Sequence, residues 1–270
     1  MITLLTDFGI SDPYAGIMKG VILSVNPFAQ IIDVTHGIKP QDIMGAAYLI
    51  NAVYRYFPKG STHVVVVDPG VGSGRSIIAV SAGGHFFLAP DNGVLSLVLE
   101  DLCADTIIKV ENEIYFLKPV SRTFHGRDIF APIAGHLSKG VGIDNFGPAI
   151  PRDQTVTIAL PKPYLSESGE LVGKVISVDR FGNLITNIDL QKINDTFGFN
   201  KDLSLKILIG SHKIEGLSLA YHDAAPGSLL AIIGSMGFVE ISLNCGNASK
   251  YCGESKGSIV KVSAADKSSG

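Results

Sequence analysis

Carboxylates follow several short apolar segments in the first half of the chain. Asp7 ends ITLLTDFG, with Asp12 in the turn after it; Asp68 ends VVVVDPG, and Asp91 follows FFLAP. A buried strand that ends in a carboxylate is costly unless that group is paired or used. Open α/β sheets bind ligands beyond the carboxyl ends of their strands. The alternative is that each aspartate only caps a turn or the start of a helix.

A glycine-rich segment, GVGSG at residues 70–74, separates Asp68 from Arg75. Its spacing does not fit the G-x-G-x-x-G fingerprint, and no G-K-[ST] follows. The next residues, 76–80, predict a strand rather than the helix whose N-terminus would hold a pyrophosphate. We interpret the segment as a connection that brings Arg75 back towards Asp68.

The densest group of ionisable residues is SRTFHGRD, residues 121–128. It places His125 at the start of a predicted helix, where the positive end of the helix dipole favours a neutral imidazole. The alternative is a capping segment with a surface ion pair. The other histidines show no metal-binding spacing such as H-E-x-x-H, so no metal site is predicted.

A second polar group, DRFGN at residues 179–183, lies in the other half of the chain. Phe181 and Asn183 could stack on and hydrogen-bond to a flat heteroaromatic ring. Equally, the segment could be an ordinary hairpin turn in which Gly182 and Asn183 supply positive φ angles.

Strands alternate with helices in the first half, which predicts a layered α/β domain with a mainly parallel sheet. The expected strands are Ile2–Phe8, Ile31–Thr35 and His63–Pro69, with further strands at residues 76–80 and before Asp91; the expected helices are Tyr14–Val25, Gln41–Phe57 and His125–Lys139.

The pattern changes near residue 148, where prolines cluster around a short expected strand, Thr155–Leu160. After it, helix signals nearly vanish and short strands separated by turn residues predict a small all-β domain, either barrel or sandwich. These strands are Leu171–Val178, Leu203–Ile209, Ser228–Ile233, Phe238–Leu243 and Ser258–Val262. We expect two domains, residues 1–150 and 163–265.

Composition excludes several classes of protein. With 46% hydrophobic and 17% charged residues, the chain does not have the composition of a disordered protein. A net charge of −3 without any basic run disfavours nucleic-acid binding. The apolar runs are too short for a membrane span, and the first residues do not form a secretory leader. Three cysteines without C-x-x-C fit a reducing cytoplasm, where we expect this protein.

Five motifs, taken in order, resemble the SAM hydroxide adenosyltransferase family, whose members hydrolyse S-adenosyl-L-methionine (SAM) to adenosine and are related to fluorinase and chlorinase. The similarity runs from residue 2 to about residue 250, across both expected domains. The motifs are TDFGISDPYAGIMKG (6–20), VVDPGVGSGR (66–75), APDNG (89–93), TFHGRDIFAP (123–132) and DRFGNLITNI (179–188).

The resemblance implies a homotrimer in which SAM lies between the N-terminal domain of one subunit and the C-terminal domain of its neighbour. It implies attack of water or hydroxide at C5′ of SAM, with methionine as the leaving group and neither a metal nor a cofactor. The expected ligands are therefore SAM, adenosine and methionine.

The resemblance also assigns roles to residues of this sequence. The catalytic set is Asp68, Arg75 and His125, and either Asp68 or His125 could be the base. The expected substrate contacts are Asp7 to the ribose, Asp12 and Asp179 to the methionine amine, Asn183 and Phe181 to the adenine ring, and Ser235 to the methionine carboxylate. Where the fluorinase branch carries an arginine after that serine, this chain has Met236, so Ser235 and backbone N–H groups would have to hold the carboxylate.

Other functions remain open from the sequence. A non-catalytic sensor of SAM or adenosine would use the same pocket, and a nucleoside hydrolase or phosphorylase would act at C1′ and release adenine. A SAM-dependent halogenase is disfavoured by Asp68, because a like charge about 4 Å from a halide costs ~4 kcal/mol at an effective dielectric constant of 20.

Overall fold

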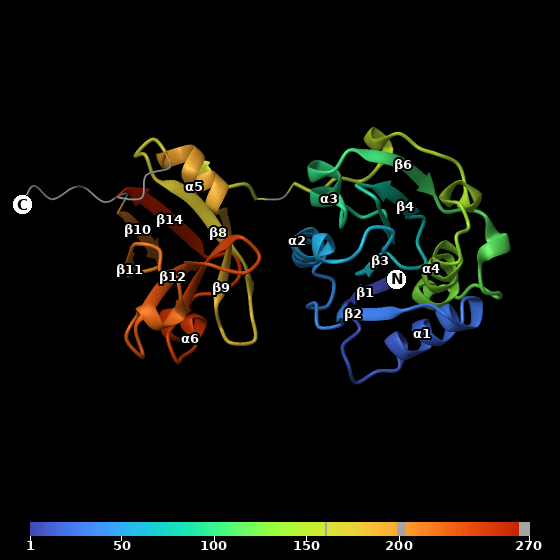
Figure 1. The fold of residues 1–270 in the computed structure, drawn as a ribbon, viewed down its shortest axis with the longest axis horizontal. Coiled ribbons are helices and arrows are strands. Elements are labelled where there is room, and N and C mark those ends of the chain that lie inside the picture. The colour runs from blue at the N-terminus through green and yellow to red at the C-terminus, as the bar shows by residue number, and fades with distance from the viewer. Residues whose placement is uncertain (160, 199–203, 265–270) are drawn as a thin grey trace, which may run out of the picture. The chain divides into compact units, whose positions relative to one another are not determined.

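The computed structural model describes residues 1–159, 161–198 and 204–264. The chain divides into two compact units, Met1–Ala159 and Leu160–Gly270, which are drawn in Figure 1. This confirms the expected two-domain architecture, an α/β unit followed by a β unit.

The first unit is built on a six-stranded sheet of order β2-β1-β3-β5-β4-β6. Its strands are β1 (Ile2–Thr6), β2 (Ile31–Thr35), β3 (Thr62–Val66), β4 (Ile77–Ala82), β5 (His85–Pro90) and β6 (Ala104–Lys109). The four strands β2, β1, β3 and β5 are parallel, whereas β4 runs antiparallel to both β5 and β6. The mainly parallel sheet predicted from the continuous apolar runs is therefore confirmed, with one reversed strand.

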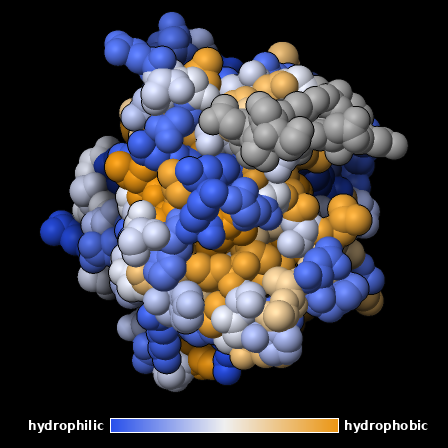
Figure 2. Space-filling model, turned by 90° about the vertical axis from the view of Figure 1, so that its left-hand side faces the viewer, coloured by the Kyte–Doolittle hydropathy of each residue, from blue (hydrophilic) through white to orange (hydrophobic). Residues whose placement is uncertain are grey.

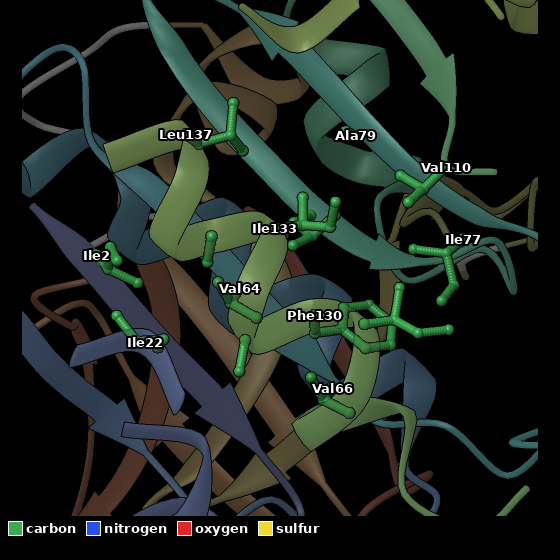
Figure 3. Packing of buried hydrophobic residues seen from close by; sticks show 14 of the residues in the cluster. Ile2, Ile22, Val64, Val66, Ile77, Ala79, Val110, Phe130, Ile133 and Leu137 are labelled. Atoms are coloured by element: carbon green, nitrogen blue, oxygen red, sulfur yellow. The ribbon is translucent and has the colours of Figure 1, made fainter. Parts of the chain in front are cut away.

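Helices cover both faces of this sheet (Figure 1). They are α1 (Tyr14–Val25), α2 (Ile43–Val53), α3 (Ser96–Asp101) and α4 (Ala131–Ser138), with a π-helix, η3, at Gly126–Phe130 and short 3₁₀ turns η1 (Tyr54–Tyr56), η2 (Glu113–Tyr115), η4 (Ile143–Phe146) and η5 (Arg152–Gln154). On one face, Ile22 of α1 and Ile133 of α4 pack against Val64 of β3 (Figure 3). On the other face, Ile50 of α2 and Val98 of α3 are buried in a second cluster. Full burial of such side chains stabilises the fold by about 1.5–3 kcal/mol each.

Two predicted elements of this unit differ from the structure. The helix expected at His125–Lys139 starts as the π-helix η3 and becomes α-helical only at Ala131. The strand expected at Thr155–Leu160 is wrong over residues 155–159, and residue 160 lies outside the described residues. There, the N–H of Val156 donates to the Asp91 carboxylate (2.9 Å) and the N–H of Ile158 to Ser96 Oγ (3.0 Å), so side chains replace a strand partner.

The second unit is an antiparallel, nearly closed barrel of order β11-β10-β14-β8-β9-β13-β12, with β7 paired to β8. Its strands are β7 (Tyr164–Leu165), β8 (Leu171–Val178), β9 (Leu184–Asp189), β10 (Leu205–Ile209), β11 (His212–Glu215), β12 (Leu229–Ile233), β13 (Phe238–Leu243) and β14 (Ile259–Ala264). A bridge between Ser218 and Ile232 brings the two edges together. Of the expected strand at 203–209, residue 203 lies outside the described residues.

Short helical segments also occur in this unit, at α5 (Leu190–Phe197), α6 (Ala248–Cys252) and the 3₁₀ turn η6 (Tyr221–Asp223). The side chain of Asp189 caps α5 by accepting from Lys192 N (2.6 Å), and Asn247 caps α6 by accepting from Lys250 N (2.8 Å). No helix in the described ranges is both long and apolar enough to cross a membrane.

Candidate functional site

Asp68, Arg75 and His125 lie together at the carboxyl end of β3. Asp68 comes two residues after that strand, Arg75 two residues before β4, and His125 at the residue that caps η3. Arg75 Nε donates to Asp68 Oδ1 (2.8 Å), and Arg75 Nη2 donates to Asp68 Oδ2 and to His125 Nδ1 (2.9 Å). The side chains of the ion pair are only 10% (Arg75) and 5% (Asp68) exposed, so its charge–charge attraction is only weakly screened.

The bond from Arg75 fixes the tautomer of His125. A guanidinium can only donate, so Nδ1 of His125 is the acceptor and the neutral ring carries its proton on Nε2. Burial lowers the pKa of His125, and the positive charge of Arg75 lowers it further, whereas Asp68 and Asp128 act in the opposite direction. The imidazole is therefore neutral at pH 7, through burial and the charge of Arg75, and offers an Nε2–H donor.

Two close contacts hold the loops that carry these side chains. Gly72 has φ +76°, and a Cβ on it would overlap the carbonyl oxygen of Arg122, so the loop after β3 lies against the segment before His125. The buried Asp128 carboxylate accepts from Ser121 N (2.8 Å) and from Arg127 Nε (2.6 Å). Burial would raise the pKa of Asp128, but these hydrogen bonds outweigh it and lower the pKa. A π-helix next to a functional residue is a common arrangement.

Three of the predicted site residues line one cavity of about 290 Å³: Asp7, Asp68 and His125. Asp7 Oδ2 accepts from the backbone N–H of Gln41 (2.8 Å), a residue with φ +66° that also lines the cavity. Arg75 does not line it but lies behind, with its guanidinium 5.9 Å from the centre of the Phe130 ring. The arrangement presents two carboxylates and one N–H donor to a small ligand.

A cavity of about 910 Å³ in the second unit is lined by four more predicted site residues: Asp179, Phe181, Asn183 and Ser235. The Asp179 carboxylate accepts from the N–H groups of Phe181 (2.9 Å) and Asn183 (2.8 Å) and from Asn183 Nδ2 (2.9 Å). The hairpin interpretation is thus right for Gly182, with φ +89°, but wrong for Asn183, which does not have a positive φ. Asn183 Nδ2 uses one of its two hydrogens on Asp179, so its second N–H and its amide oxygen are left for a ligand.

Two strand-end carboxylates do not join these cavities. Asp12 is exposed and lines neither of them. The Asp91 carboxylate accepts from the backbone N–H of Val156, which fits the alternative that this aspartate only caps local backbone. The sequence interpretation missed Gln41 in the first cavity and Tyr221 and Glu240 in the second. None of these belongs to a motif, and only the fold brings them to the cavities.

The donor set does not favour a metal centre. Within residues 1–159, 161–198 and 204–264, no three side chains of His, Cys, Asp or Glu are grouped so that they could hold a metal ion. Two ionisable groups at the first cavity, Asp68 and His125, are instead bonded to the guanidinium of Arg75.

Family models match nearly the whole chain. Residues 2–147 match the N-terminal domain of SAM hydroxide adenosyltransferase, and residues 173–261 match its C-terminal domain. The chain belongs to the SAM hydroxide adenosyltransferase family. The resemblance inferred from the five motifs is therefore confirmed.

Members of this family with curated names are similar over most of their length. The (R)-S-adenosyl-L-methionine hydrolase of Methanocaldococcus jannaschii is 38% identical, covering 93% of this chain and 90% of that protein. The protein of the same name from Salinispora arenicola is 32% identical, with 97% of both chains covered. A fluorinase from Actinoplanes is 28% identical over 90% of this chain and 91% of its own.

The same two-unit fold occurs in a crystal structure of an uncharacterized conserved protein from Thermotoga maritima. It is 35% identical, with a TM-score of 0.90, and covers 97% of this chain and 100% of that chain. The family fold and the order of its two domains are thus shared by this chain.

Proposed function

We propose that this protein hydrolyses SAM by attack of water or hydroxide at C5′, giving adenosine and L-methionine. The observation that carries the proposal is the hydrogen-bonded set of Asp68, Arg75 and His125 at one cavity with Asp7. The names of the relatives that are 30–38% identical, all (R)-S-adenosyl-L-methionine hydrolase, support it.

The chemistry needs little beyond placement and removal of a proton. A sulfonium is already an activated leaving group, so no acid is required for methionine to depart. Holding water and SAM in line is worth ~7–11 kcal/mol, and a positioned base contributes roughly 10²–10⁴-fold. We assign the proton acceptor to Asp68, because Arg75 occupies Nδ1 of His125. In this assignment His125 donates Nε2–H to the attacking oxygen, and Arg75 stabilises its negative charge.

The substrate contacts are part of the proposal. Asp7 binds the ribose hydroxyls, and Asn183 and Phe181 bind adenine; Asp179 and Asp12 bind the methionine amine, and Ser235 binds its carboxylate. The lining of the two cavities supports all of these except Asp12, which is exposed. The arginine of the fluorinase branch is replaced by Met236, so no cationic side chain is assigned to the carboxylate.

Halogenation and ligand sensing are the alternatives. Asp68 argues against a halide at the first cavity, because a carboxylate that lines this cavity would repel an anion. A sensor would bind SAM without consuming it, which product analysis distinguishes.

We also propose a cytoplasmic homotrimer with SAM bound between the N-terminal domain of one subunit and the C-terminal domain of the next. Large apolar side chains on the surface support association: Ile10 and Phe28 are each 92% exposed. Figure 2, which faces the second unit, shows apolar residues that lie open between hydrophilic ones. Light scattering should give the mass of three subunits, and a monomer that turns over SAM would overturn the trimer. The three free cysteines are compatible with a reducing compartment.

The test of the activity is incubation of purified protein with SAM, followed by chromatography of the products. Separate reactions with the (R) and (S) sulfonium epimers are needed, since the relatives are named for the (R) form. Adenosine and methionine in equal amounts, unchanged by a chelator, are expected. Free adenine, S-adenosylhomocysteine or intact SAM would each overturn the proposal.

A further inference from the structure

Glu240 is a buried carboxylate that lines the cavity in the second unit. It is 6% exposed and belongs to β13. In register it lies between Ile185 of β9 and Ile232 of β12, which also line the cavity. Its carboxylate lies against Gly234, where a Cβ would overlap it. The acid is therefore held between apolar side chains and faces the cavity.

The lining of this cavity offers Glu240 no positive charge. Its ionisable members are Asp179, Tyr221, Glu240 and Cys245, and none is a lysine, arginine or histidine. The Tyr221 hydroxyl donates to Glu240 Oε2 only at 3.5 Å, a long hydrogen bond. Burial raises the pKa of Glu240, the negative charge of Asp179 raises it further, and the Tyr221 hydrogen bond acts in the opposite direction.

A buried carboxylate without a cation is costly, and a ligand can supply the missing charge. We propose that Glu240 is a specificity-determining residue, which makes this cavity bind cationic adenosyl compounds in preference to neutral nucleosides. The inference rests on the proposed function for the identity of the ligand. SAM carries two cationic groups, the sulfonium and the α-ammonium, whereas the product adenosine carries none. Glu240 thus favours capture of the substrate and release of the nucleoside.

Three ligands that are not hydrolysed test this by calorimetry on the full chain. Sinefungin carries an ammonium where SAM has the sulfonium, S-adenosylhomocysteine has a neutral thioether there, and 5′-methylthioadenosine lacks the amino-acid end. Glu240→Gln removes the charge and keeps the size. It should weaken sinefungin binding by about tenfold or more and leave 5′-methylthioadenosine binding unchanged.

The three ligands also distinguish the two cations. If Glu240→Gln weakens the binding of S-adenosylhomocysteine as much as that of sinefungin, Glu240 interacts with the α-ammonium. If only sinefungin binding weakens, Glu240 interacts with the group at the position of the sulfonium. Ser242→Ala is the matched control, since Ser242 is buried two residues along β13 and does not line the cavity. It should change none of the three affinities. An equal loss for all three ligands in Glu240→Gln, or no loss, would overturn the inference.

The wild-type protein gives a second measurement that does not depend on the variant folding. Calorimetry from pH 7 to pH 5 should show that sinefungin binding weakens more than 5′-methylthioadenosine binding as the pH falls, because Glu240, whose pKa is raised by burial, loses its charge. An equal dependence on pH for the two ligands would overturn the inference. Selective binding of cations without hydrolysis of SAM would overturn only the proposed function.

Discussion

Arg75 bonds to Asp68 and His125 at once, so at the scale of single residues the protonation state of the histidine depends on the arginine. Arg75→Gln removes a positive charge that lowers the pKa of His125, and that pKa should rise. The imidazole of the variant is then protonated at a higher pH than that of the wild type, so the acid limb of the kcat/KM profile should move to higher pH. Arg55→Gln, a surface change, is the control. An unchanged or lowered acid limb would contradict this role of Arg75.

Asp68→Asn tests the assignment of the proton acceptor. The amide keeps the size of the side chain but cannot take a proton, so kcat should fall roughly 10²–10⁴-fold, with a smaller change in KM. Asp91→Asn alters an aspartate at the same kind of strand end that only caps a loop, and kcat should stay near the wild-type value. Steady-state rates of adenosine formation measure both. A fully active Asp68→Asn enzyme would mean that another group takes the proton.

The grouping of Asp68, Arg75 and His125 could be predicted from the sequence, but the hydrogen bonds among them could not. Strand ends and motif order were enough to single out Asp68 and His125, because parallel strands present their carboxyl ends at one edge. The tautomer of His125 depends on which ring nitrogen Arg75 reaches, and this depends on the folded positions of the two side chains. Glu240 was missed because an alternating strand pattern places it on the outer face of the barrel, and its burial depends on residues distant in sequence, such as Tyr221.

At the scale of elements, the site depends on the contact between the loop after β3 and the segment before η3. Gly72→Ala would place a Cβ on the Arg122 carbonyl oxygen and strain a positive φ, so the two loops must separate. We expect kcat to fall at least about tenfold, because small displacements of catalytic groups are costly. Gly74→Ala is the matched control, since no atom lies within 4 Å of a Cβ there and φ is not positive. Equal activities of the two variants would contradict this dependence.

Periodic segments were predicted well and segments without a periodic pattern were not. Helix Tyr14–Val25 and strands Leu171–Val178 and Phe238–Leu243 have the predicted bounds, since each shows a clear apolar pattern. The strand expected at residues 155–159 failed because its backbone donates to the side chains of Asp91 and Ser96. The apolar pattern of residues 126–130 fits an α-helix, so the sequence gives no signal for the π-helix η3.

At the scale of the whole molecule, stability should fall in acid because of a buried histidine remote from the proposed site. His63 of β3 is fully buried, bonded to Thr3 Oγ1 (2.8 Å) and His85 Nδ1 (3.2 Å), and burial lowers its pKa to about 3. The unfolded chain takes up a proton near pH 6.5 and the folded chain does not, so this group destabilises the fold as the pH falls from 6.5 towards 3. The slope is at most about 1.4 kcal/mol per pH unit.

Urea unfolding at pH 7 and pH 5 measures this effect. Between pH 7 and pH 5, the free energy of unfolding should fall less for His63→Gln than for the wild type. His222→Gln, at an exposed side chain, should follow the wild type. A wild-type slope retained by His63→Gln would assign the acid sensitivity to other groups.

The origin of the new oxygen atom in adenosine tests whether water attacks C5′ of SAM. Hydrolysis of SAM in ¹⁸O-labelled water, analysed by mass spectrometry, should place one label on the 5′-oxygen of adenosine and none in methionine. That result follows from attack of a water held by Asp68 and His125 on C5′. Unlabelled adenosine, or label in methionine, would contradict the account.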